Sequence, residues 1–182
     1  MSTATKTQTR ERDHIDSFLE TIRERLPMLD LEVEGIVDRI GGLNRRFKRA
    51  MDETLGEFKL DHAEHRILAF LSRQDETYRS SPGKLARVME LSSGAMTNRL
   101  DRMEEAGLLR RLPDPSDRRG VLVELTPEGK RLYEEAVGVQ ARKEELIASA
   151  LSVAEKKQLH ALLRRLMMEF ERLEGGPPPE DC

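Results

Sequence analysis

The stretch that decides the fold is residues 81–126, which reads SPGKLARVMELSSGAMTNRLDRMEEAGLLRRLPDPSDRRGVLVELT. Its opening Ser-Pro is typical of a helix N-cap followed by proline in the first turn. A serine pair that begins at Ser92 opens a second helical segment, and Gly107 ends it. Two β-prone runs, 108–112 and 121–125, then flank a turn rich in proline and aspartate. This order predicts a helix, a turn, a second helix and a β-hairpin.

The second helix of this stretch has one apolar side and one polar side. Met96, Leu100 and Met103 recur at i, i+4 and i+7 and form an apolar stripe. The opposite side is centred on Asn98, whose amide can pair with adenine in a major groove, and two flanking arginines can reach a guanine or a phosphate. A solvated helix face is the alternative interpretation. The residues of this region predicted to face outward and contact DNA are Ser81, Ser92, Ser93, Ala95, Thr97, Asn98, Arg99 and Arg102.

The hairpin is predicted to carry Asp117-Arg118-Arg119-Gly120 at its tip, and this pattern favours DNA over a merely solvated surface. Asp117 precedes Arg119 by two positions, so its carboxylate can brace that guanidinium inside a narrow minor groove. Arg118 points the other way and would meet a phosphate. Arg110, at the base of the wing, is a further candidate for a phosphate contact.

The composition of the 182 residues suits one helical domain, since 36% are charged, 37% hydrophobic and only 4% aromatic. The net charge is -3, but residues 82–120 carry eight basic and six acidic side chains. The single cysteine, Cys182, excludes a disulfide framework. No run approaches the length of a membrane span, and the N-terminus is polar, so a cytoplasmic protein without membrane contact is expected.

The helical segments on either side of the winged helix carry long apolar stripes that cannot easily cover one another within one small chain. A second copy of the chain is therefore expected to cover them, with packing inside one chain as the alternative. The predicted organisation is a disordered tail (1–12), N-terminal dimerisation helices (13–58), a winged helix-turn-helix DNA-binding domain (59–126), C-terminal dimerisation helices (127–174) and a flexible tail (175–182). The predicted fold class is mainly α with a small β-wing.

Three segments resemble the winged-helix core of the MarR family of bacterial regulators: SPGKLAR at 81–87, SSGAMTNRLDRMEEAGL at 92–108 and DPSDRRGVLVELTPEG at 114–129. The strongest resemblance covers 61–129, and the flanking helices agree in number and order. The resemblance implies a homodimer whose terminal helices interlock. It also implies that two winged helices meet adjacent major grooves of a pseudo-palindrome, usually under the control of a small-molecule inducer.

The resemblance also implies where an effector would bind, between the dimerisation helices and the winged helix. The expected lining residues are Arg39, Phe47, His62 and His65. Urate-responsive relatives use a tryptophan near the start, and peroxide-sensing relatives use an N-terminal cysteine. This chain has no tryptophan and its only cysteine is the last residue, so neither mechanism is expected.

The sequence thus predicts a homodimeric transcriptional regulator that binds double-stranded DNA, a repressor released from its operator by an anionic or phenolic ligand. One alternative is a constitutive DNA-architectural protein without an inducer, and another is a winged helix that serves protein–protein contacts. An enzyme is not expected, because no nucleophile–base pair or phosphate loop is present. No cofactor is expected, and the four histidines lack zinc-ligand spacing.

Overall fold

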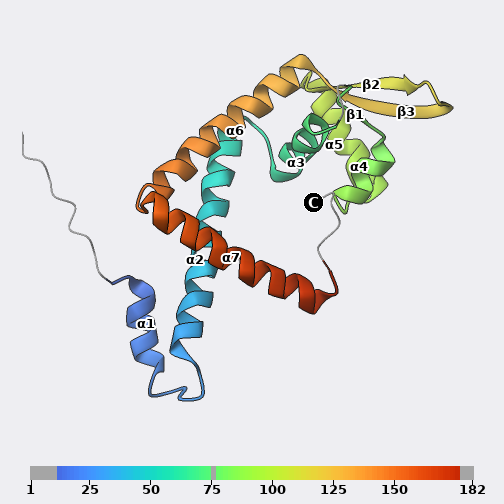
Figure 1. The fold of residues 1–182 in the computed structure, drawn as a ribbon. Coiled ribbons are helices and arrows are strands. Elements are labelled where there is room, and N and C mark those ends of the chain that lie inside the picture. The colour runs from blue at the N-terminus through green and yellow to red at the C-terminus, as the bar shows by residue number, and fades with distance from the viewer. Residues whose placement is uncertain (1–11, 75–76, 177–182) are drawn as a thin grey trace, which may run out of the picture. The chain divides into compact units, whose positions relative to one another are not determined.

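The computed structural model describes residues 12–74 and 77–176. Its elements, in chain order, are α1 (His14–Ile22), α2 (Leu31–Glu57), α3 (His62–Ser72), β1 (Arg79–Ser80), α4 (Pro82–Val88), α5 (Ser93–Glu105), β2 (Leu109–Asp114), β3 (Asp117–Leu125), α6 (Pro127–Ala148) and α7 (Val153–Glu174) (Figure 1). This mainly helical fold with one small antiparallel sheet confirms the predicted fold class.

The chain forms two compact units, Met1–Arg49 and Ala50–Cys182. The predicted N-terminal tail, apart from Arg12, and residues 177–182 of the predicted C-terminal tail lie outside the described residues. The helix α2 ends at Glu57, whereas the two compact units divide within α2, after Arg49. The assignment of dimerisation and DNA-binding roles to the regions on either side stays a prediction.

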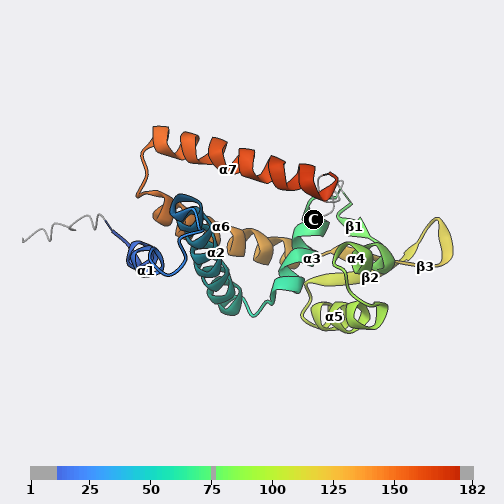
Figure 2. The same cartoon turned by 90° about the horizontal axis from the view of Figure 1, so that it is seen from below.

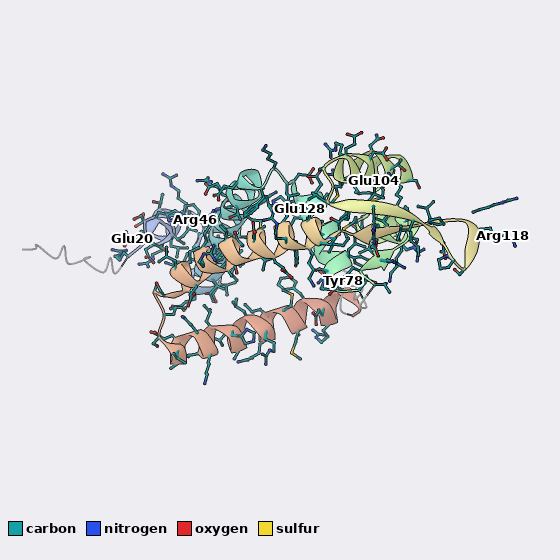
Figure 3. All side chains as sticks on the ribbon, turned by 90° about the horizontal axis from the view of Figure 1, so that it is seen from above. Glu20, Arg46, Tyr78, Glu104, Arg118 and Glu128 are labelled. Atoms are coloured by element: carbon teal, nitrogen blue, oxygen red, sulfur yellow. The ribbon has the colours of Figure 1, made fainter. Side chains whose placement is uncertain are left out.

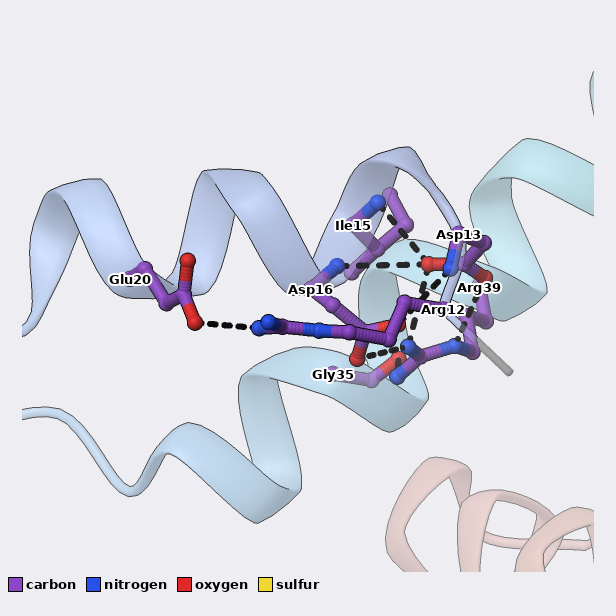
Figure 4. Close-up of polar contacts among 7 residues, drawn as sticks. All are labelled: Arg12, Asp13, Ile15, Asp16, Glu20, Gly35 and Arg39. Carbon is purple, nitrogen blue, oxygen red and sulfur yellow. Dashed lines mark hydrogen bonds and ion pairs between the residues drawn. The ribbon is translucent and has the colours of Figure 1, made fainter. Parts of the chain in front are cut away.

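In the first unit, an arginine on α2 is bound to the start of α1. Asp13 caps α1 and forms a capping box with Asp16. Arg39 Nε lies 3.0 Å from Asp13 Oδ2, and Arg39 Nη2 lies 2.6 Å from Asp16 Oδ1 (Figure 4). A side chain on Gly35 would come within 3.1 Å of Leu19 Cδ1, so the glycine permits the two helices to approach closely.

In the second unit, the core lies between α3, α4, α5 and the sheet. Ile67, Leu68 and Leu71 of α3 are fully buried, as the apolar pattern of this helix requires. The stripe on α5 that includes Met96 and Leu100 is buried in the same cluster. Burial of these side chains is the main source of stability for this unit, at roughly 1.5–3 kcal/mol for each large side chain.

The sheet has the strand order β1-β3-β2, and both pairs are antiparallel. The strand β1 has only two residues, and the sequence patterns do not predict it. The hairpin extends further than predicted, and it projects beyond α4 and α5 (Figures 1 and 2). On the inner face of the sheet, Val123 and Leu125 are buried in the core.

The predicted position of the hairpin tip is wrong by several residues. The turn is formed by residues 115–116, where Asp114 Oδ1 accepts hydrogen bonds from the backbone and side chain of Ser116 at 2.8 and 2.6 Å. Asp117 pairs with Asp114 whereas Val121 pairs with Pro113, so residues 118–120 bulge out of the ladder. The bulge explains the error, because the Arg-Arg-Gly run breaks the alternation without forming the turn.

A tight joint connects the start of β2 to the start of α6. Thr126 caps α6, and its Oγ1 donates to the carbonyl oxygen of Gly107 at 2.7 Å. The backbone N–H of Thr126 donates to the carbonyl oxygen of Leu108 at 3.1 Å. A Cβ on Gly129 would lie 2.2 Å from that same carbonyl oxygen, so no other residue fits here without displacing the helix.

Candidate nucleic-acid interface

The helix α5, the recognition helix of the motif, presents the polar face that the sequence predicts. Ser92 caps it, accepting a hydrogen bond from the backbone N–H of Ala95 at 3.2 Å. Within the described residues, the Asn98 side chain has no hydrogen-bond partner, so its amide is available to a base edge. The exposed residues of the predicted set on this helix and its cap are Ser92, Ser93, Ala95, Thr97, Asn98 and Arg102.

Arg99 departs from the expected outward orientation. Its side chain is only 21% exposed and is bound to the carboxylate of Asp61, the N-cap of α3. Arg102 Nη2 lies 3.2 Å from Glu64 Oε1 in the same capping box, although its side chain is 61% exposed. The arginines face α3 because the capping box concentrates negative charge there. Burial opposes ionisation of Asp61, but the Arg99 guanidinium and the backbone N–H groups of Ala63 and Glu64 together outweigh it and hold the pKa of that carboxyl below its ordinary value.

Ser81 plays a local role of its own at the start of α4. Its hydroxyl oxygen accepts a hydrogen bond from the backbone N–H of Lys84 at 3.2 Å, and proline fills the first helical position. The residue is half-buried. A phosphate contact by Ser81 stays a prediction.

The wing carries two arginines that are free to meet a ligand. Arg118 and Arg119 are exposed, and neither guanidinium has an ion-pair partner among residues 12–74 and 77–176. The side chain of Arg118 points away from the end of the hairpin (Figure 3). Asp117 does not brace the Arg119 guanidinium as predicted. Its Oδ1 accepts instead from the backbone N–H of Arg119 at 2.9 Å, because the bulge brings that N–H within reach of the carboxylate.

At the base of the wing, Arg110 is paired rather than free. Its Nε binds Glu124, which also binds Arg79 of β1, with 2.9 Å between Arg79 Nε and Glu124 Oε1. The hydrogen bond from Arg110, with help from Arg79, lowers the pKa of the largely buried Glu124 carboxyl. Sequence reasoning misses Arg79 because a two-residue strand has no recognisable alternation. Arg110 keeps 60% of its side chain exposed.

Three of the four predicted effector residues contact another side chain of their own unit, and the fourth, Phe47, is partly exposed to solvent. In the first unit, Arg39 is bound to Asp13 and Asp16, and Phe47 is 39% exposed. In the second, His62 Nε2 lies 2.6 Å from Asp52 Oδ1. The ring of His65 contacts that of Tyr133 in a tilted arrangement with 5.5 Å between ring centroids, and burial and the neighbouring His62 lower the pKa of His65. A single effector site that joins these residues stays a prediction.

Metal-binding and membrane-spanning features are both missing from the described part of the chain. No group of three or more His, Cys, Asp or Glu side chains there is arranged to hold a metal ion. No helix there is long and apolar enough to cross a membrane.

A short helix, a recognition helix and an arginine-bearing antiparallel hairpin together define a winged helix-turn-helix, a class of DNA-binding transcription regulator. The chain belongs to the MarR family. The family's sequence model matches residues 58–120. The chain is also 34% identical over 152 residues to the HTH-type transcriptional regulator PecS of Dickeya dadantii, covering 84% of this chain and 92% of that protein.

Solved structures agree with this assignment. The crystal structure of apo MarR from E. coli superposes with a TM-score of 0.60 at 27% identity, covering 71% of this chain and 94% of that one. A mutant of MepR from S. aureus, solved with a bound oligodeoxyribonucleotide, shares the fold with a TM-score of 0.60 at 20% identity, covering 74% of this chain and 97% of that one. The protein is therefore a DNA-binding transcription regulator and not an enzyme.

Proposed function

We propose that this protein is a homodimeric repressor that binds a pseudo-palindromic operator and leaves it when a small molecule binds. The observation that carries the DNA-binding part is the combination of an unpartnered Asn98 on the recognition helix with the unpaired Arg118 and Arg119 on the projecting wing, as far as the described residues extend. The amide suits a base edge in a major groove, and the arginines suit the negative potential of the flanking minor groove. The similarity to bacterial relatives, among them the HTH-type transcriptional regulator PecS, supports action in the bacterial cytoplasm.

The apolar surface of α7 supports the dimer. None of the residues of α7 is buried by the rest of the described chain. Large apolar side chains recur along one side of the helix at i, i+3, i+4 and i+7, and a contiguous patch of this size marks a protein interface. Its exposed apolar residues are Val153, Leu159, Leu162, Leu163, Leu166, Met167, Met168, Phe170 and Leu173. A second copy of the chain is the simplest partner, because a two-fold axis lets one patch cover itself.

A dimer makes the spacing of the two recognition helices the quantity that a ligand can control. Two winged helices related by a two-fold axis fit half-sites about one helical turn apart, roughly 34–36 Å. A ligand that binds more tightly to a dimer with a different spacing shifts the population away from the DNA-binding form. This shift between two dimer conformations is sufficient for the proposed release from the operator.

The test combines footprinting with light scattering. Footprinting on the DNA upstream of the protein's own gene should reveal two protected half-sites about ten base pairs apart, centre to centre. Multi-angle light scattering should give twice the mass of one 20.8 kDa chain. Replacing Leu163 with Glu on α7 should dissociate the dimer and remove the footprint, whereas Glu169→Gln on the same helix should retain both. A monomer that protects a single site would refute the proposal.

A further inference from the structure

A pocket of about 420 Å³ lies at the base of the wing, on the face of the sheet that points away from the core. The cross-strand neighbours Arg79, Glu124 and Arg110 form its floor, since these positions pair across β1, β3 and β2. Tyr78 and Lys130 line its side. This pocket belongs wholly to the second unit, and it is separate from the exposed face of the recognition helix.

The lining residues combine three cations with one carboxylate. Glu124 Oε1 binds Nε and Nη2 of Arg79 at 2.9 and 2.8 Å, and its Oε2 binds Arg110. A guanidinium has five N–H donors, so both arginines keep donors that Glu124 does not use. Lys130 adds a third positive charge, and the nearest acidic side chain on its own helix to influence it is Glu134, one turn further along. Among the described residues that line the pocket, the charge is therefore net positive, and an entering anion meets unused donors.

Tyr78 has a backbone conformation that is strained for a residue with a bulky side chain, and its carbonyl oxygen accepts a hydrogen bond from the backbone N–H of Leu125 at 3.1 Å. Its φ is +53°, in the left-handed region that bulky side chains rarely adopt. The other two residues with positive φ that are not glycine, Lys59 and Glu90 among those described, follow helix ends, where this conformation is ordinary. Tyr78 precedes a strand instead, and such strain in ordered structures concentrates at binding and active sites.

The strained backbone brings the phenol ring against Lys130. The lysine Nζ lies 3.0 Å from the Tyr78 hydroxyl and 4.7 Å from the ring centroid. Because the hydroxyl oxygen accepts from the ammonium, its own hydrogen remains able to donate to a third group. The exposed Pro127 provides apolar surface beside the ring. The pocket thus offers donors for a charged head and an apolar surface for the body of a ligand.

We infer that this pocket binds a small organic anion with a carboxylate or phosphate head and an apolar body. The head would accept hydrogen bonds from Arg79, Arg110 and Lys130, while the body would rest on Tyr78 and Pro127. The carboxylate of Glu124 holds the two guanidinium groups in place, so that the ligand does not have to order them. The inference does not depend on DNA binding, since the protein alone provides every contact.

The test measures binding of phenyl phosphate and of inorganic phosphate to the full chain by calorimetry, without DNA. Phenyl phosphate should bind saturably, and more tightly than inorganic phosphate, which lacks the apolar body. Lys130→Gln should weaken phenyl phosphate about tenfold, the loss expected for one charge-assisted contact. Arg131→Gln is the matched control: it removes the same charge from the next residue, whose side chain pairs with Glu128 and Glu135 outside the pocket.

A second variant shows whether a loss of binding reflects the pocket or a failure to fold. Tyr78→Gly removes the ring and relieves the positive φ, which offsets part of the loss of the ring's packing against the core, so the variant should still fold, as urea denaturation can verify, while losing phenyl phosphate binding. Absence of saturable binding, equal weakening by Lys130→Gln and Arg131→Gln, or equal affinity for both phosphates would each overturn the inference. DNA footprinting of the same variants separates this result from the proposed repressor function.

Discussion

Arg99 and Arg102 on the recognition helix lie beside the capping box of α3, whereas Arg118 and Arg119 on the wing have no carboxylate partner among the described residues. Both pairs lie in the same DNA-binding motif. An arginine already bound to an acidic partner must give up that contact, or share it, before it can bind DNA. An unpaired exposed arginine loses only water and side-chain freedom. The difference predicts that the wing contributes more to DNA affinity than the helix arginines do.

The largest expected effect comes from the wing. Changing Arg118 and Arg119 together to Ala should lower DNA affinity about a hundredfold, given roughly 1–3 kcal/mol for each good contact. The dependence of log affinity on log salt should become shallower by about two. Fluorescence anisotropy at several salt concentrations measures both. The charge-matched control is Arg131→Ala with Arg142→Ala on α6, and a comparable loss in that control would contradict a specific role for the wing.

The next effect concerns the unpartnered amide on the recognition helix. Asn98→Ala should weaken operator binding about tenfold, because one bidentate base contact is worth about 1–3 kcal/mol. It should also relax the preference for one base pair in each half-site. Binding to a library of single-base operator variants measures that preference. The control is Thr97→Ser, which retains a hydroxyl and should leave the base preference intact. If Asn98→Ala weakened binding equally for every operator variant, Asn98 would contact the DNA backbone and not a base.

Arg99 should affect stability more than base preference. Its removal leaves Asp61 with only the more distant Arg102, whose Nη2 lies 3.7 Å from Asp61 Oδ2, and the expected loss in the free energy of unfolding is about 1 kcal/mol, discounted because Asp61 is half-exposed. Urea denaturation measures the loss, and the operator library shows whether the base preference changes. If removing Arg99 changed the base preference but not the free energy of unfolding, Arg99 would have to leave Asp61 and contact a base. The helix arginines would then not differ from the wing arginines.

The smallest effect depends on pH. Asp61→Asn keeps the helix cap but removes the charge, so it should cost less than about 1 kcal/mol at pH 7. The folded-state pKa of Asp61 lies below its ordinary value of 3.8. The ionised carboxylate therefore stabilises the fold fully above pH 3.8, and this stabilisation is lost as the pH falls through the folded-state pKa. Urea denaturation of both proteins should therefore give a constant difference from pH 7 to about 5 that shrinks below 3.8. A difference that grows towards low pH would contradict the ion pair.

The sequence predicts the helices of the motif well because their signals are local. The i, i+4, i+7 spacing of Met96, Leu100 and Met103 identifies the buried side of α5, and Ser92 marks its start. These patterns depend only on neighbours within one helix. They also show which side of α5 is available to DNA before any tertiary contact is known.

The sequence does not predict which arginines are free, because their partners are distant along the chain. Asp61 lies 38 positions before Arg99, and Arg79 lies 45 positions before Glu124. The predicted hairpin tip is wrong for a related reason, since the bulge at 118–120 depends on the register with the opposite strand. Ion pairs between distant residues and the register of paired strands depend on how whole helices and strands pack together. The local sequence pattern of one helix or strand carries no information on that packing.

The joint at Thr126 and Gly129 has a mechanical consequence. Three hydrogen bonds from Thr126 to the carbonyl oxygens of Gly107 and Leu108, together with the missing side chain of Gly129, fasten the first turn of α6 to the residues directly before β2. The helix α6 and the β2–β3 hairpin are therefore expected to move as one rigid body. A small tilt at the far end of this 22-residue helix would therefore displace the hairpin that carries Arg118.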